Sequence, residues 1–268
     1  GIDTISFGNT LGFLIDCYKQ GLITEKETDG IKLDWGKAEI LPNLVESTAH
    51  KKGLGRILAE GVKRASETYG GEEFAMHVKG LELPAYDPRG AKGMGLAYAT
   101  SNRGGCHLRA YMAMSEALSF PRYLDPLKLD GKAELVKRLQ DIYAVLDSMV
   151  LCKFTSFALF DTLAYEPRLY ARLLTTTTGF YLDEEEFRKT GERIYNIERL
   201  FNIREGFDRH NDTLPARLLH VPMPSGPAKG QIIELERMLD EYYELRGWDM
   251  EGNPTDRKIQ ELGITEEP

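Results

Sequence analysis

The chain has 268 residues, 42% of them hydrophobic, which is enough apolar material for the core of one large domain or two ordinary ones. Its 34 basic and 42 acidic residues give a formal net charge of -8, and no window interleaves basic with aromatic residues, so we expect no nucleic-acid partner. No apolar run approaches the roughly 20 residues needed to cross a bilayer, and the start lacks the pattern of a signal peptide, so we expect a soluble, cytoplasmic protein with no membrane partner.

The N-terminal part of the chain has helical periodicity. Apolar residues three or four positions apart predict a helix that ends near Gly21, with Asp16 and Cys17 off its apolar stripe. The segment 44–70 predicts two further helices, broken between Gly53 and Gly55. The stripe of the first helix consists of Leu11, Leu14, Ile15, Tyr18 and Leu22.

A short stretch after these helices alternates as a strand does, and it is bounded by Gly80 and Pro84. The Gly/Pro-rich stretch 84–95 marks either a domain junction or a functional loop. We expect one helical domain over 1–78 and a second over 79–268. The alternating residues are Phe74, Met76, Val78, Leu81 and Leu83.

Three long helices are predicted in the C-terminal half. The first leads toward Cys152, the second begins with a capping box of Asp183 and Glu186, and the third stops at Gly247. We therefore predict an all-α, multihelical fold of two packed helical domains with at most a short β-hairpin. The apolar positions are Leu135, Leu139, Ile142, Tyr143, Leu146 and Val150; Phe187, Ile194, Ile197 and Phe201; and Ile232, Leu235, Leu239, Tyr242 and Leu245.

Two residues have side chains suited to chemistry. Cys152, in DSMVLCKF, is either a small core residue, as cysteine often is, or a metal ligand. The three cysteines are too few for a disulfide framework and show no CxxC spacing. His107 lies in a glycine-rich, basic loop and is either a proton carrier or a satisfied polar residue. That loop either binds a phosphate or only turns the chain.

Several runs along the chain together resemble the aldehyde:ferredoxin oxidoreductases. They are GIDTISFGNT, GLGRILAEGVKRASE, AYDPRGAKGMGLAYATSNRGGCHLRAY, DSMVLCKF, NIREGFDRHNDTLPAR and RGWDMEGNPTDRKIQELGI. The resemblance covers nearly the whole chain and corresponds to the C-terminal helical part of such an enzyme. It implies, as a partner, an N-terminal β-rich domain or subunit with a CxxCxxxC run.

The resemblance implies that a small aldehyde is oxidised to a carboxylic acid at a tungsten bis-pterin cofactor, with tungsten preferred over molybdenum. Electrons then pass through a four-iron four-sulfur cluster to ferredoxin. Asp16 and His107 correspond to the family's catalytic residues, and Cys152 to the fourth cluster ligand. The cofactor-binding residues implied are Asp29, Leu33 and Asp34 of DGIKLD, Arg109, and Asp147 and Leu151 of DSMVLC, with Lys32 and Val150 at the family's glycine positions.

One cluster cysteine of four cannot hold a cluster, so we expect the chain alone to bind neither cofactor and to be inactive. A homo-oligomer is compatible with this interpretation. The alternative is a non-catalytic helical binding or assembly module derived from the same family.

Overall fold

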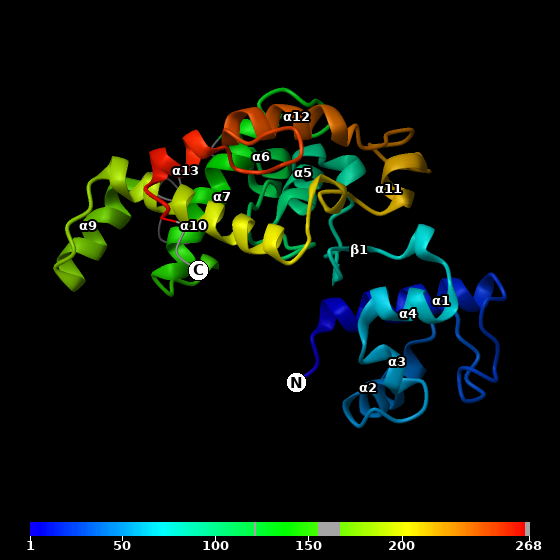
Figure 1. The fold of residues 1–268 in the computed structure, drawn as a ribbon. Helices are drawn as coiled ribbons and strands as arrows, with labels where there is room; N and C mark the ends of the chain where they lie inside the picture. Colours follow the sequence, from blue (N-terminus) through cyan, green and yellow to red (C-terminus); the bar gives the residue numbers. More distant parts are fainter. Residues whose placement is uncertain (121, 155–166, 266–268) are drawn as a thin grey trace. The chain divides into compact units, whose positions relative to one another are not determined.

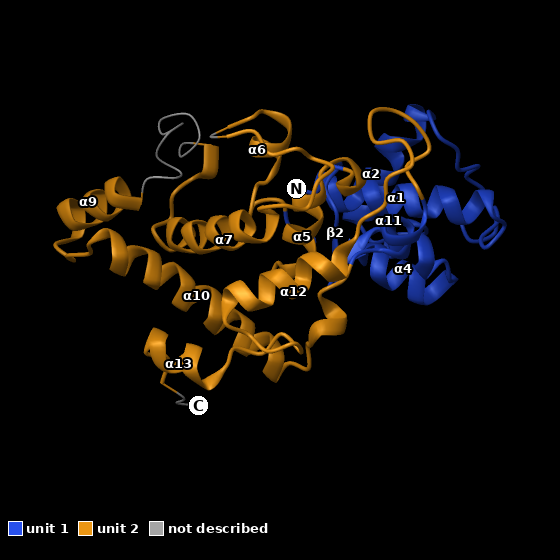
Figure 2. Ribbon diagram, turned by 90° about the horizontal axis from the view of Figure 1, so that it is seen from above, with its two compact units in different colours: residues 1–86, 103–106, 214–221 blue, residues 87–102, 107–213, 222–268 orange. Residues whose placement is uncertain are grey.

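The computed structural model describes residues 1–120, 122–154 and 167–265. In these parts the chain is helical with one two-stranded hairpin, so the predicted all-α class is confirmed (Figure 1). No helix in the described parts is long and apolar enough to cross a bilayer. Internal contacts divide the chain into two compact units (Figure 2): unit 1 is 1–86, 103–106 and 214–221, and unit 2 is 87–102, 107–213 and 222–268. The expected domains 1–78 and 79–268 stay a prediction.

Unit 1 is built on helix α1, Thr4–Lys19, which begins where the Asp3 side chain accepts a hydrogen bond from the Ser6 N–H at 2.8 Å. Of its predicted apolar stripe, Leu11, Leu14 and Ile15 are buried and Tyr18 is partly buried, but Leu22 lies beyond the helix and is exposed. Cys17 was placed off the stripe and is fully buried, because the core surrounds α1 more widely than one stripe. That prediction was wrong.

The other elements of unit 1 are short. The expected break at Gly53 to Gly55 is present, and a second break precedes Gly61, whose φ of 85° favours glycine. The buried Glu82 carboxylate accepts a hydrogen bond from the Val62 N–H at 2.7 Å and so caps the helix that follows this break. These elements are α2 (Leu41–Ala49), α3 (Gly55–Leu58), α4 (Gly61–Tyr69), β1 (His77–Val78) antiparallel to β2 (Leu81–Glu82), and α11 (Ala216–His220).

Unit 2 is a helical assembly in which α7 packs against α10, α12 and α5. Asp183 caps the start of α10 as predicted, since its carboxylate accepts a hydrogen bond from the Glu186 N–H at 2.8 Å; the return bond from the Glu186 side chain, which a capping box needs, stays a prediction. Its elements are α5 (Lys92–Thr100), α6 (Ala113–Ala117), α7 (Lys132–Ser148), α9 (Pro167–Thr178), α10 (Glu184–Arg204), α12 (Leu235–Arg246) and α13 (Asp256–Leu262).

The inner face of α10 differs from the predicted apolar stripe. Ile197 and Phe201 are exposed, whereas Tyr195 and Arg199 are buried. The Tyr195 hydroxyl donates to the Thr100 carbonyl at 2.7 Å, and the Arg199 guanidinium donates to Asp212 at 3.2 Å. Polar side chains with partners therefore replace apolar ones on this face, which hydropathy alone does not predict.

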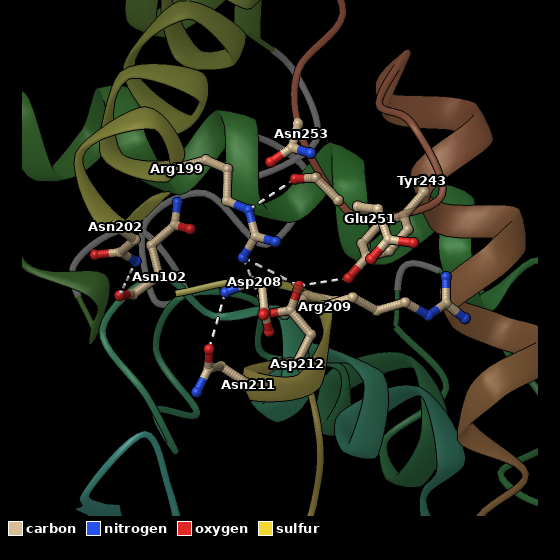
Figure 3. Close-up of polar contacts among 12 residues, drawn as sticks. Asn102, Arg199, Asn202, Asp208, Arg209, Asn211, Asp212, Tyr243, Glu251 and Asn253 are labelled. Atoms are coloured by element: carbon tan, nitrogen blue, oxygen red, sulfur yellow. Dashed lines mark hydrogen bonds and ion pairs between the residues drawn. The ribbon is translucent and has the colours of Figure 1, made fainter. Parts of the chain in front are cut away.

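Arg199 belongs to a buried polar group that includes Asp212 and Tyr243, drawn in Figure 3. The Arg199 Nε donates to the Gly252 carbonyl at 2.9 Å, and the Tyr243 hydroxyl donates to Asp212 at 2.6 Å. Arg209 lies over the Tyr243 ring, with its guanidinium carbon 5.1 Å from the ring centre. The run NIREGFDRHND is therefore structural in unit 2, because its charged residues join α10 to α12.

The Gly/Pro-rich stretch leads directly into α5, whose residues are all buried. The first N–H groups of α5, those of Gly93 and Met94, donate to the Glu116 carboxylate at 2.8 and 3.1 Å, and Lys132 pairs with the same carboxylate at 2.5 Å. Burial raises the pKa of Glu116, while Lys132 opposes this. A helix start suited to a phosphate therefore already holds the chain's own carboxylate.

Candidate functional site

A groove of about 450 Å³ runs along one face of α1 in unit 1. We call it the α1 groove. The α1 positions that line it repeat every four residues, at 4, 8, 12 and 16 and at 5, 9 and 13, so they share a face of the helix. Its lining residues are Thr4, Ile5, Gly8, Asn9, Gly12, Phe13 and Asp16 of α1, together with Trp35, Phe74, Met76, Ala85 and Arg217.

Asp16 and Arg217 form an ion pair in the α1 groove, with 3.0 Å between Oδ2 and Nη2. The guanidinium carbon of Arg217 also lies 5.5 Å from the centre of the Phe74 ring. An opposite charge and an aromatic face together restrict the orientation of the carboxylate. Sequence analysis identified Asp16 but missed Arg217, although Arg217 ends the quoted run NIREGFDRHNDTLPAR.

The DGIKLD segment is held by local contacts of unit 1. Leu33 is buried in the core. Asp29 accepts a hydrogen bond from the Leu54 N–H at 2.5 Å, and Asp34 accepts one from the Trp35 N–H at 2.8 Å. Lys19 hydrogen-bonds to Asp34, 2.5 Å away, and lowers the pKa of that carboxyl. Every one of these contacts fixes the loop that carries Trp35 into the α1 groove.

In unit 2 the structure brings two of the predicted cofactor residues together. Arg109 Nη1 lies 3.5 Å from Asp147 and 3.4 Å from Glu198, a residue that the sequence analysis missed. Lys153 also pairs with Asp147. The Nε of Arg109 is buried without a hydrogen-bond partner in the described structure. Arg109 thus has its charge matched by the chain's own carboxylates, while its buried Nε–H is left to donate.

The end of α7 contains the segment DSMVLC, which carries the predicted site residues Asp147, Leu151 and Cys152. The Val150 N–H donates to the Asp147 carbonyl at 3.0 Å and the Leu151 N–H to the Leu146 carbonyl at 3.1 Å, which is the Schellman pattern of a helix C-terminus. Val150 is left-handed, with φ of 59°, and 90% exposed. The glycine of the family pattern is therefore explained here by the backbone conformation that ends the helix.

The three cysteines differ in accessibility. Cys152 is exposed, two residues beyond Val150, whereas Cys17 and Cys106 are buried. Burial raises the pKa of the Cys17 thiol to about 11, which suppresses the thiolate that a metal requires. No group of three or more His, Cys, Asp or Glu side chains within the described residues is arranged to hold a metal ion. Cys152 is therefore the accessible thiol of the three, and its role as a cluster ligand stays a prediction.

His107 lies in unit 2, where its ring makes an edge contact with the Tyr111 ring at 5.9 Å between centroids. Asp16 belongs to unit 1. The two residues predicted to be catalytic are thus each placed within their own unit, and their pairing remains a prediction.

Comparison with known proteins shows which family the chain resembles. A sequence model described as aldehyde ferredoxin oxidoreductase, domains 2 & 3, matches residues 1–264. Tungsten-containing aldehyde ferredoxin oxidoreductases of Thermococcus kodakarensis and Pyrococcus furiosus are each 46% identical to this chain over 269 residues. Those alignments cover 99% of this chain and 44% of each relative, so the chain spans less than half the length of these relatives.

A more distant relative is the aliphatic sulfonate oxidoreductase, WOR-like subunit, of Pyrococcus furiosus, 31% identical over 99% of this chain and 41% of its own length. Among solved structures, the active site complex BamBC of benzoyl coenzyme A reductase with 1,5-dienoyl-CoA is similar, with a TM-score of 0.76. That similarity covers 98% of this chain and 44% of the other at 18% identity, so it shows the fold alone.

Proposed function

Because the chain belongs to the aldehyde ferredoxin oxidoreductase family, we propose that it supplies the helical part of a tungsten enzyme that oxidises aldehydes to carboxylic acids. The main support is the α1 groove, which is mostly apolar and holds the Asp16–Arg217 ion pair. An aldehyde has an apolar body and a polar carbonyl group. The apolar lining of the groove can contact the body, and the ion pair can contact the carbonyl group. The activity is assigned to the full-length protein, since the chain spans 44% of its relatives.

Oxidation of an aldehyde consumes water and releases the acid, two protons and two electrons. When bound, the tungsten bis-pterin and the four-iron four-sulfur cluster supply the acceptor for these electrons and their path to ferredoxin. We assign to Asp16 the role of accepting a proton from the attacking water, the ordinary work of a carboxylate base. Arg217 holds that carboxylate in place, and the apolar wall of the groove holds the body of the aldehyde. We assign to His107 the second proton transfer, since imidazole titrates near neutral pH.

The remaining family residues receive roles that their contacts support. We propose that Arg109 donates its buried, unpartnered Nε–H to the pterin, because a buried donor is costly unless an acceptor satisfies it. Asp147 holds Arg109, and Leu151 completes the turn that presents Cys152. We propose that Asp29, Leu33 and Asp34 act indirectly, by fixing the loop that carries Trp35.

Cys152 gives the clearest test of the cofactor assignment. In the full-length enzyme we expect Cys152→Ala to remove the cluster's iron and its visible absorption and to stop electron transfer to ferredoxin. Cys106→Ala, at a buried thiol, is the control and should keep its iron. The proposal is wrong if Cys152→Ala retains a full complement of iron. An enzyme that contains no tungsten and oxidises no aldehyde would instead support the non-catalytic binding module.

A further inference from the structure

We propose that Glu198 is a positioning residue of the cofactor site, which holds a buried donor on Arg109 and a buried acceptor on Asn102 for the edge of a pterin ring. The inference rests on the proposed function and extends it to a residue of α10 and to a second polar group offered to the pterin. All three residues belong to unit 2.

Glu198 bridges two side chains that are separate in the sequence. Its Oε1 lies 3.4 Å from Nη1 of Arg109, and its Oε2 accepts a hydrogen bond from Nδ2 of Asn102 at 3.4 Å. The two oxygens of one carboxylate therefore take different partners. The position of Glu198 thus helps to fix where Arg109 and Asn102 lie relative to each other.

The amide of Asn102 has a defined orientation. Its Nδ2 also donates to the Tyr195 carbonyl at 3.0 Å, so both partners of this nitrogen are acceptors and the amide oxygen cannot take its place. The Asn202 side chain donates to the Asn102 carbonyl at 2.7 Å (Figure 3). These α10 residues are three and four positions apart, so one face of the helix holds both the backbone and the side chain of Asn102.

Two atoms of this arrangement are buried without a hydrogen-bond partner among the described residues, Asn102 Oδ1 and Arg109 Nε. The first is an acceptor, and the second carries a proton to donate. A buried polar atom that no group satisfies is destabilising, and native proteins pair nearly all of them. One acceptor and one donor, held through the same carboxylate, suit a planar ligand edge that offers a donor beside an acceptor.

The pyrimidinone ring of a pterin has such an edge, because its ring N–H and amino groups donate and its carbonyl oxygen accepts. We assign the Arg109 Nε–H to the carbonyl oxygen and the Asn102 Oδ1 to an N–H of the same ring. Glu198 needs no contact with the ring, since it acts through the two side chains that it holds.

The test is the rate at which the full-length tungsten enzyme releases pterin after dilution, followed by the fluorescence of the released, oxidised pterin. Glu198→Gln keeps the size of the side chain but turns an amide NH₂ toward a donor that needs an acceptor. We expect pterin release to accelerate at least about tenfold, the fold-change for one lost charge-assisted hydrogen bond. Glu185→Gln makes the same change at an exposed position of α10 and should leave the rate unchanged.

A second measurement separates positioning from a general loss of structure. Arg109→Lys keeps the positive charge but has no Nε–H, and Asn102→Ala removes Oδ1. In an enzyme that carries both substitutions, Glu198→Gln should change the release rate less than twofold, because the groups through which it acts are gone. Equal acceleration in both backgrounds, or no acceleration in the otherwise unchanged enzyme, overturns the inference and leaves the two buried atoms to ordered water.

The outcomes also separate this inference from the proposed function. Pterin release that depends on Glu198 in an enzyme that oxidises no aldehyde would preserve the inference and refute the function. Aldehyde oxidation with a release rate that Glu198→Gln does not change would preserve the function and refute the inference. A full-length protein that contains no pterin when produced with tungstate refutes both.

Discussion

Val150→Gly is expected to stabilise the protein. Val150 occupies the left-handed position of the α7 terminus, with φ of 59°, and its side chain is 90% exposed. A left-handed residue with a Cβ costs about 1–2 kcal/mol, and removing an exposed side chain loses little packing. Glycine also gives the unfolded chain more conformational freedom, which offsets roughly 0.5–1 kcal/mol of that gain in stability. The net gain in the free energy of unfolding is therefore about 1 kcal/mol, or roughly 2–4 °C in Tm for a chain of this size.

The assay is urea unfolding followed by circular dichroism, with Val150→Ala and Val221→Gly as controls. Alanine keeps the Cβ, so Val150→Ala should recover little of the gain. Val221 is also exposed but has extended backbone with φ of -103°, so glycine there should be neutral or destabilising. An unchanged or reduced free energy of unfolding for Val150→Gly, or an equal gain for Val150→Ala, would refute the backbone explanation of this motif position.

Two further effects on stability follow from ion pairs. Burial raises the pKa of Glu192, but Lys137 and Lys258 outweigh it and leave this pKa below its ordinary value. A depressed carboxyl pKa stabilises the fold above the unfolded value of about 4.3 and loses that stabilisation as pH falls through the folded pKa. Glu192→Gln should therefore lower the free energy of unfolding by about 1–2 kcal/mol at pH 7, and in acid the two proteins should become equally stable. Glu261 is the exposed partner of Lys258, so Glu261→Gln is the control and should lower the free energy of unfolding by under about 0.5 kcal/mol at pH 7. Asp16→Asn should change the free energy of unfolding by less than about 1 kcal/mol, because the pair that Asp16 forms with Arg217 is partly exposed. Denaturant unfolding at pH 7 and in acid measures this free energy for all three variants.

Local patterns in the sequence were sufficient to predict several helices and the residues at which two of them begin or end. Apolar spacing predicted α1, α7 and α12, Asp183 marked the start of α10, and Gly247, with φ of 69°, ended α12. Each of these signals lies within one or two turns of the residue that it explains. Such short-range signals do not depend on the tertiary fold.

Features set by distant pairing could not be predicted in this way. The partner of Asp16 is Arg217, 201 residues away along the chain. The anion at the α5 start is the carboxylate of Glu116, 23 residues after Gly93. The buried face of α10 carries Arg199, whose burial is tolerable only because Asp212 and the Gly252 carbonyl satisfy it. Hydropathy predicts that Arg199 is exposed, and nothing in the local sequence pairs Asp16 with Arg217, 201 residues away. The candidate site was therefore predicted with Asp16 but without the residue that holds it.

The most direct test of the proposed chemistry is kcat/KM for octanal in the tungsten-loaded, full-length enzyme, compared between wild type and Asp16→Asn at equal tungsten content. Removing a general base costs on the order of 100-fold or more, so we predict at least that loss for Asp16→Asn. Glu244→Gln, exposed on α12, should retain wild-type kcat/KM. Equal kcat/KM for Asp16→Asn and wild type would contradict a reaction that takes place beside Asp16 in the α1 groove.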